Sequence, residues 1–269
     1  MQVSTKSALQ TRIATATPLI AGFLAALYWA PAPVWIGLTG LVLLLAAWEW
    51  AAMAGLGRIP GLIYAVLLCA AGNGLAFTAP SLAEPFYPAL AFWLLAPTLL
   101  ARAVAVRPAA LHLGLGIIVL LPTQLGLIAL RDISPDLLLV VVGVVVIADT
   151  AAYFSGRAFG KHKLAPSISP GKTWEGAIGA WLAITIYALL LYVYAPATIK
   201  LQCLPQALAL FWALFGLSVL GDLFESTLKR QAGIKDSGTL LPGHGGILDR
   251  IDSLTAVLPA ATLFWMWLK

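Results

Sequence analysis

The chain has 269 residues, of which 61% are hydrophobic and only 10% are charged, with a mean hydropathy of +0.94. Soluble domains carry about 25% charged residues, so this composition excludes an ordinary water-soluble protein and predicts a membrane protein. The net charge of +5 is not distributed as a nucleic-acid-binding face would be, and we expect no nucleic-acid partner. The abundant aromatic residues are typical of side chains at bilayer interfaces.

Nine apolar runs are long enough to cross a bilayer, which takes roughly 20 residues of helix. Proline or glycine residues stand between them. The first run is longer than the apolar core of a signal peptide, so we expect it to be retained as a helix. The runs cover residues 13–30, 34–53, 61–79, 88–106, 111–130, 136–154, 176–195, 206–224 and 251–268.

This pattern predicts an all-α, polytopic integral membrane protein of about nine transmembrane helices, folded as a single domain over residues 1–269. Basic residues divide unequally between the two ends of these helices, with 13 on the side of the N-terminus and 3 on the other side. Because basic loops favour the cytoplasm, we expect a cytoplasmic N-terminus and a C-terminus outside. The two longest polar loops, residues 155–175 and 225–250, then share the cytoplasmic side.

Acidic residues stand where the apolar runs meet these loops. Asp149 lies near the end of the sixth run, Asp222 ends the eighth and Asp249 opens the ninth. Ionisable residues at such positions suggest a functional site. The eighth and ninth helices form a hairpin that can bring Asp222 and Asp249 face to face, and two carboxylates at one level suit Mg²⁺ together with substrate phosphates. The alternative is that these carboxylates pair with Lys229 or Arg250 to close the hairpin; the basic, glycine-rich loop between them favours the metal.

The loop before the ninth helix reads Leu-Pro-Gly-His-Gly-Gly at residues 241–246. Glycines such as Gly245 and Gly246 let backbone N–H groups surround an anion. The N-terminus of the helix that follows also favours phosphate. His244 could bind a phosphate or transfer a proton, although a single loop histidine is more often an ordinary surface residue.

The other polar loop contains Gly-Lys-Thr at residues 171–173, directly before the seventh run. It is not a Walker A loop, because Pro166 stands where the first glycine of that motif would be and no βα unit carries it. A lysine, a hydroxyl and free N–H groups at a helix start still predict a phosphate site. Lys161 and Lys163 are better explained by the positive-inside rule and by anionic lipid headgroups.

These features together predict a basic pocket with carboxylates for a divalent metal at one membrane surface. Phosphoryl or nucleotidyl transfer to a lipid requires such an arrangement, because cations stabilise the charge on the transferring phosphates.

The segment S-T-L-K-R-Q-A-G-I-K-D-S-G-T-L-L-P-G-H-G-G-I-L-D-R-I-D at residues 226–252 resembles, without departure, the pattern of phosphatidate cytidylyltransferases, the CDP-diacylglycerol synthases. Residues 148–161, 169–176 and 221–226 are also similar to that family. The resemblance is strongest from about residue 148 onward. It implies transfer of CMP from CTP to phosphatidic acid, which gives CDP-diacylglycerol and pyrophosphate in phospholipid biosynthesis. Residues 1–145 would then be scaffold helices and residues 146–269 the catalytic half.

The resemblance also implies roles for individual residues. Asp222 and Asp249 would bind Mg²⁺, and K⁺ could bind beside it as a second cation. The catalytic residues would be Asp222, Asp249, Lys172 and Lys229. The residues expected to bind the substrates are Asp149, Ser169, Lys172, Thr173, Lys229, Arg230, Lys235, Asp236, His244, Gly245, Gly246, Arg250 and Asp252.

The partners implied are CTP, phosphatidic acid, membrane lipids and a second copy of the chain in a homodimer. The expected location is the bacterial plasma (inner) membrane, with the active site facing the cytoplasm. One alternative is a CTP-dependent transferase that acts on an ether lipid or a polyprenol. Another is an ion-coupled secondary transporter with an ion path through Asp149, Asp222 and Glu225. The transporter is disfavoured because these charges lie near one membrane face and no internal repeat is visible.

Overall fold

The computed structural model describes residues 5–79, 82–106, 108–196, 199, 201–240 and 245–268, with side chains from residue 17 onward. Within these ranges it contains nine helices and one short antiparallel sheet. The elements in chain order are α1 (Thr5–Trp29), α2 (Ala32–Met53), α3 (Arg58–Thr78), α4 (Phe86–Ala101), α5 (Ala109–Ile133), α6 (Pro135–Phe159), β1 (Lys163–Ala165), β2 (Ser169–Thr173), α7 (Trp174–Tyr194), α8 (Leu204–Gln231) and α9 (Leu248–Leu268).

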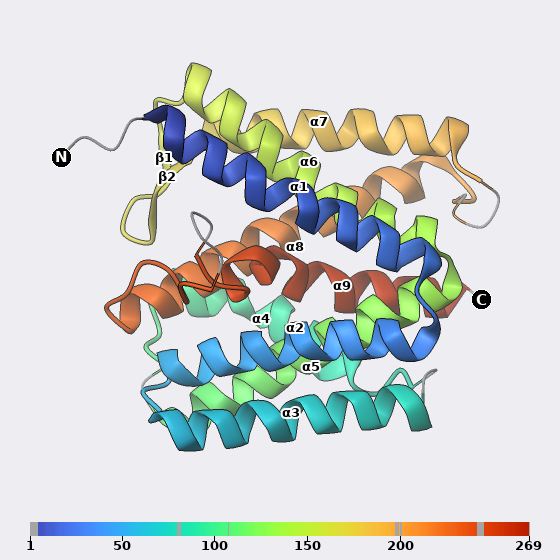
Figure 1. Ribbon diagram of the computed structural model, residues 1–269. Coiled ribbons are helices and arrows are strands. Elements are labelled where there is room, and N and C mark those ends of the chain that lie inside the picture. The colour runs from blue at the N-terminus through green and yellow to red at the C-terminus, as the bar shows by residue number, and fades with distance from the viewer. Residues whose placement is uncertain are drawn as a thin grey trace.

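Successive helices alternate in direction, so their termini gather at two ends of the molecule (Figure 1). We call one end the hairpin end: it carries β1, β2 and the connection from α8 to α9. The turn between α5 and α6 lies at the opposite end. Proline marks several helix starts at positions where no intrahelical N–H donor is needed, namely Pro33 in α2, Pro135 in α6 and Pro205 in α8.

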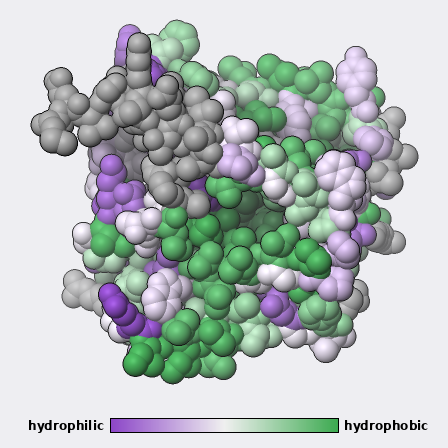
Figure 2. All heavy atoms as spheres, in the orientation of Figure 1, coloured by the Kyte–Doolittle hydropathy of each residue, from purple (hydrophilic) through white to green (hydrophobic). Residues whose placement is uncertain are grey.

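Seven of the described helices, α2, α3 and α5 to α9, are long and apolar enough to span a bilayer. Helix α4 has 16 residues, and the described apolar part of α1 is also shorter than a full span. Large hydrophobic side chains remain exposed on several helices, among them Leu67, Leu94 and Ile186, and hydrophobic residues cover much of the face seen in Figure 2. The protein is an all-α, polytopic integral membrane protein, as the sequence predicted.

The opposite end is closed by side chains that bind the end of α1. Arg131 in α5 donates from Nε to the carbonyl oxygen of Leu27 at 2.9 Å and also to the carbonyl of Ala30. Its guanidinium lies 4.9 Å from the ring centroid of Trp35 in α2. These bonds satisfy carbonyls that a helix terminus leaves without intrahelical donors, and they tie α1 to α2 and α5.

Helices α8 and α9 cross closely near the hairpin end. Gly221 makes the crossing possible, because a Cβ atom there would lie 2.6 Å from the carbonyl oxygen of Asp252 and 3.1 Å from the Cα of Ser253. Small residues let helix backbones approach one another in membranes. Asp222 follows this contact directly, so the crossing places it beside the first turns of α9.

Candidate functional site

A cavity of about 440 Å³ opens at the hairpin end between α6, α7, α8 and the β1–β2 hairpin. Its polar lining includes Asp149, Ser169, Lys172, Thr173, Ser218 and Asp222. Apolar residues of the same lining, such as Phe215 in α8 and Ala180 in α7, lie about two helical turns farther along their helices. The cavity therefore joins a charged rim to an apolar wall, which suits a ligand with a charged head and an apolar tail.

The rim carries an ion pair between two residues that the sequence singled out separately. Lys172 Nζ in β2 lies 2.5 Å from Asp222 Oδ2 in α8, and both side chains are about a quarter exposed, 26% and 25%. The Ser226 hydroxyl donates to Asp222 Oδ1 at 3.2 Å. Because both charges remain partly exposed to the cavity, an incoming anion or cation can reach them.

The hairpin that carries Lys172 is held against the start of α7. Strands β1 and β2 pair antiparallel, with Lys163 opposite Thr173. The Thr173 hydroxyl accepts from the backbone N–H of Gly176 at 3.1 Å and so caps α7. Glu175 in the first turn of α7 lies 2.7 Å from His162 Nδ1, just before β1. These bonds fix the position of the polar loop that was expected to bind phosphate through residues 171–173.

Lys229 in α8 links α8 to α9 through ion pairs. Its Nζ lies 2.5 Å from Glu225 Oε2 and 2.6 Å from Asp249 Oδ1. The other oxygen of Asp249 accepts from the backbone N–H groups of Ser237 at 2.9 Å and Gly246 at 2.8 Å. Asp249 thus pairs with Lys229, as the alternative interpretation of the sequence expected, whereas Asp222 pairs with Lys172.

Two further acidic residues surround Asp222. Asp149 in α6 and Asp252 in α9 both lie close enough to Asp222 for their charges to interact, and Lys172 and Arg250 partly balance Asp149. The Asp252 carboxylate accepts from the backbone N–H of Ser253 at 2.6 Å. Within the described ranges, no three His, Cys, Asp or Glu side chains are grouped as a metal site requires. The assignment of Asp222 and Asp249 as metal ligands stays a prediction.

The remaining predicted residues lie around this centre. Arg230 links the two polar loops, because its Nε donates to the carbonyl of Ile168 at 3.3 Å and its Nη1 to that of Ile234 at 3.1 Å. Lys235, Asp236 and Arg250 are exposed, and Ser169 is half-buried at the cavity rim. Gly245 has φ +82°, a conformation that glycine adopts without strain. His244 lies outside the described residues.

Sequence reasoning did not assign a role to Glu49, which the structure brings to the same region. This residue lies near the end of α2, four positions before Met53, and is only 3% exposed. Its carboxylate accepts hydrogen bonds from Ser237, Ile247 and Leu248, residues that lie on either side of the segment 241–244. In the sequence, Glu49 is only a lone acidic residue near the end of an apolar run, and that pattern does not indicate which residues it contacts.

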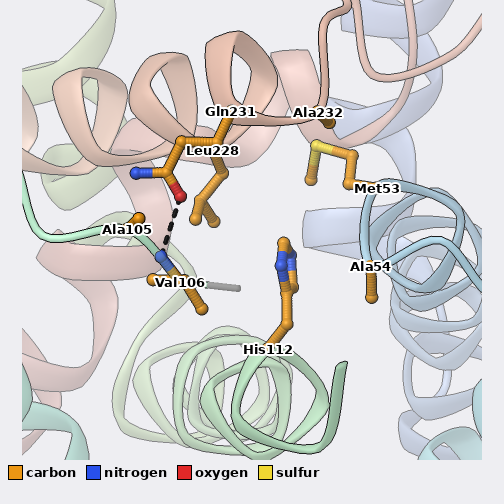
Figure 3. Close-up of a pocket in the computed structure, with 8 residues that line it drawn as sticks. All are labelled: Met53, Ala54, Ala105, Val106, His112, Leu228, Gln231 and Ala232. Atoms are coloured by element: carbon orange, nitrogen blue, oxygen red, sulfur yellow. Dashed lines mark hydrogen bonds between the residues drawn. The ribbon is translucent and has the colours of Figure 1, made fainter. Parts of the chain in front are cut away.

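A second cavity, of about 360 Å³, lies at the same end between α2, α5, α8 and the segment that precedes α5 (Figure 3). The His112 ring points into it from α5, and Gln231 Oε1 accepts from the backbone N–H of Val106 at 2.9 Å. The rest of the described lining is apolar side chains, and it includes no Lys, Arg, Asp or Glu. A polyphosphate needs cations, so the cavity beside Lys172 and Asp222 is the better candidate site.

Comparison with known proteins identifies the family. Residues 10–268 match the model of the cytidylyltransferase family. A phosphatidate cytidylyltransferase of Pseudomonas aeruginosa is 40% identical over 272 residues, which covers 96% of this chain and 97% of that protein. Phosphatidate cytidylyltransferases of Haemophilus influenzae and Staphylococcus saprophyticus are each 49% identical over 132 and 116 residues, which is 49% and 43% of this chain and 46% and 44% of theirs. The chain belongs to the cytidylyltransferase family.

Proposed function

We propose that the protein transfers CMP from CTP to phosphatidic acid, giving CDP-diacylglycerol and pyrophosphate. The observation that carries this proposal is the Lys172–Asp222 ion pair at the rim of a cavity with an apolar inner wall. A phosphatidate headgroup and the CTP phosphates would lie at the charged rim. The acyl chains would extend along the apolar residues of α7 and α8. Near full-length similarity to a phosphatidate cytidylyltransferase supports the same activity.

In this reaction a phosphate oxygen of phosphatidate attacks the α-phosphorus of CTP, and the bond to pyrophosphate breaks. The attacking phosphate is already ionised near neutral pH, so no residue need act as a strong base. The protein instead has to bring two anions together and balance their charge. Lys172 at the rim and the nearby Arg230 and Arg250 supply positive charge for that purpose.

The acidic residues support a requirement for Mg²⁺, which prefers carboxylate and phosphate oxygens. Asp149, Asp222 and Asp252 lie close enough for their charges to interact, with Lys172 and Arg250 as the cations near Asp149 and Lys229 near Asp252. Asp222 and Asp249 would hold Mg²⁺, with K⁺ as a second cation. Bound Mg²⁺ neutralises charge on the substrate phosphates. Asp222 is the better placed of the two, because its side chain is 25% exposed and lines the cavity, whereas the Asp249 side chain is only 6% exposed and is not part of the described lining.

The proposed location is the bacterial inner membrane, with the hairpin end in the cytoplasm, where CTP is found. Basic residues support this orientation, because Arg58, Arg102, Arg157 and Arg230 all lie at helix ends on the hairpin side, whereas Arg131 lies at the opposite end. A homodimer is part of the same proposal. Labelling of single cysteines placed in residues 156–171, in sealed inverted vesicles, tests the orientation: labels that react only from the lumen would overturn it.

The activity is tested with purified protein, labelled CTP and Mg²⁺ in mixed micelles that contain phosphatidate. We expect a labelled CDP-lipid and an equal amount of pyrophosphate, both dependent on Mg²⁺. Parallel assays replace phosphatidate with an ether-linked analogue or with a polyprenyl phosphate. Product with polyprenyl phosphate but not with phosphatidate would overturn the substrate assignment. Absence of product with every lipid would overturn the transferase assignment.

A further inference from the structure

Glu49 is a buried carboxylate whose hydrogen bonds to the described residues all reach Ser237, Ile247 and Leu248. It lies in the last turn of α2 between Trp48 and the fully buried Trp50. Burying an ionised carboxylate is costly unless its oxygens accept hydrogen bonds. Glu49 Oε1 accepts from the backbone N–H of Ile247 at 3.1 Å. Its Oε2 accepts from the backbone N–H of Leu248 at 2.8 Å and from the Ser237 hydroxyl at 3.0 Å.

These bonds cap α9 from another helix. The first N–H groups of a helix have no intrahelical acceptor, and a negative charge there is favourable. Helix α9 begins at Leu248, and the preceding Ile247 has no polar side-chain atom that could act as a cap. Glu49 supplies the missing acceptor from almost 200 positions earlier in the chain, since the separation to Leu248 is 199 residues.

Glu49 and Asp249 hold the same residues from two sides. Ser237 donates its backbone N–H to Asp249 and its hydroxyl to Glu49. Gly246 donates its N–H to Asp249, while the next two residues donate theirs to Glu49. Gly246 also lies directly against the Glu49 carboxylate, where any added Cβ atom would collide with its oxygens. Movement of Glu49 would therefore displace the donors that orient Asp249.

We infer that Glu49 is a positioning residue for the cytidylyl transfer, acting through Ser237 and residues 245–248 on Asp249. The inference rests on the proposed function for its effect on catalysis. It has a structural consequence of its own: residues of the C-terminal half do not complete the site without α2. Glu49 has no role in contacting substrate here, because its oxygens are buried and already bonded to the protein.

The test replaces Glu49 by glutamine, aspartate and alanine. Glutamine offers one oxygen and one NH₂ group, so the NH₂ group must face a backbone N–H of Ile247 or Leu248. We expect kcat of Glu49→Gln to fall ~10–100-fold, as loss of an outer hydrogen-bond partner typically does, with a smaller change in KM for CTP. Glu49→Asp keeps the charge with a shorter reach and should recover part of kcat. Glu49→Ala should lose the most.

Two controls separate this role from a general loss of stability. Glu84→Gln alters a glutamate that precedes α4 at the opposite end and should leave kcat unchanged. Hydrogen exchange of Glu49→Gln should increase in peptides that cover residues 233–240 and 245–252, but not in α3 or α7. Ser237→Ala removes one of the three bonds and should lower kcat less than Glu49→Gln.

Normal kcat and unchanged exchange in Glu49→Gln would overturn the inference. So would faster exchange throughout the bundle, because it would assign Glu49 a general structural role. If Glu49→Gln does not fold, Glu49→Asp with wild-type kcat would overturn it as well. Failure of the wild-type protein to make CDP-lipid would instead contradict the proposed function, and the exchange measurement would still test whether Glu49 anchors residues 245–248.

Discussion

The two ends of the helical bundle use charged side chains differently. At the opposite end, Arg131 donates to backbone carbonyls of α1, and the Tyr28 hydroxyl donates to Asp136 at 2.6 Å. Arg131 and Asp136 are thus each matched by a partner on another helix. At the hairpin end, carboxylates from α6, α8 and α9 lie close enough for their charges to interact, and Lys172 pairs with Asp222 at the rim of the cavity. The need to satisfy helix termini explains the bonds of Arg131 at the opposite end. It does not explain why carboxylates gather at the hairpin end.

The difference indicates where function resides in the bundle. Charges that only close helix ends find backbone or single side-chain partners and leave little net charge. Three interacting carboxylates beside Lys172, Lys229 and Arg250 are costly at a membrane surface, and ionisable residues at such positions usually mark a functional site. This difference between the two ends can be tested by replacing charged residues with neutral ones at each end and measuring activity and stability separately.

The largest effect is expected from Asp222→Asn. Loss of this carboxylate removes the partner of Lys172 and the better placed candidate ligand for Mg²⁺, so turnover should fall below detection while the protein still inserts into membranes. Radiolabelled CTP incorporation into lipid measures turnover, and size-exclusion chromatography in detergent measures folding. The matched control at the opposite end is Asp136→Asn, which should retain near wild-type activity. Near-normal Mg²⁺-dependent activity in Asp222→Asn would contradict the metal assignment.

Lys172→Met should have the next largest effect. The substitution keeps most of the length of the side chain but removes the ammonium group at the cavity rim. Loss of one donor that stabilises a developing charge typically costs about 10²–10³-fold in kcat. Steady-state kinetics with CTP and phosphatidate measure the loss. Lys163→Met in β1, which is exposed on the same hairpin, serves as the control; equal losses in both variants would show that the hairpin contributes only general positive charge.

His244→Ala should be milder. The phosphate of phosphatidate is already ionised, so no general base is needed, and we expect a loss smaller than the ~100-fold that a general acid or base contributes. The kcat across pH 6–9 measures this directly for wild type and variant. A loss as deep as that of Asp222→Asn would show that His244 is a necessary acid or base.

Arg131→Met should change activity least and stability most clearly. Its removal leaves carbonyls of Leu27 and Ala30 without their donor and separates α1 from α5. At about 1 kcal/mol for each net hydrogen bond, the free energy of unfolding should fall by about 1–3 kcal/mol. Thermal unfolding in detergent measures the shift, with kcat of the remaining folded protein close to wild type. A large loss of kcat without loss of stability would contradict the view that charges at the opposite end serve stability and those at the hairpin end serve function.

The sequence by itself predicted the all-α membrane fold, because hydropathy and run length are local properties of the chain. Each of the nine expected runs falls on one described helix. The differences are at the boundaries: the fourth run was expected to reach residue 106, but α4 ends at Ala101, where Ala103 turns the chain with φ +47°. The β1–β2 hairpin was not anticipated, because its polar residues show no alternating pattern that would indicate strands. The motifs at residues 148–176 and 221–252 also predicted the family.

Only the tertiary structure decided which charges meet. Asp222 faces Lys172, which lies 50 positions earlier in the chain, while Asp249 faces Lys229. Glu49 caps a helix that begins 199 positions later. No local pattern contains these pairings, since they depend on how closely the helices cross, as at Gly221 against Asp252. Spacing along the sequence identified the charged residues, and helix packing selected their partners, because a salt bridge requires approach in space rather than along the chain.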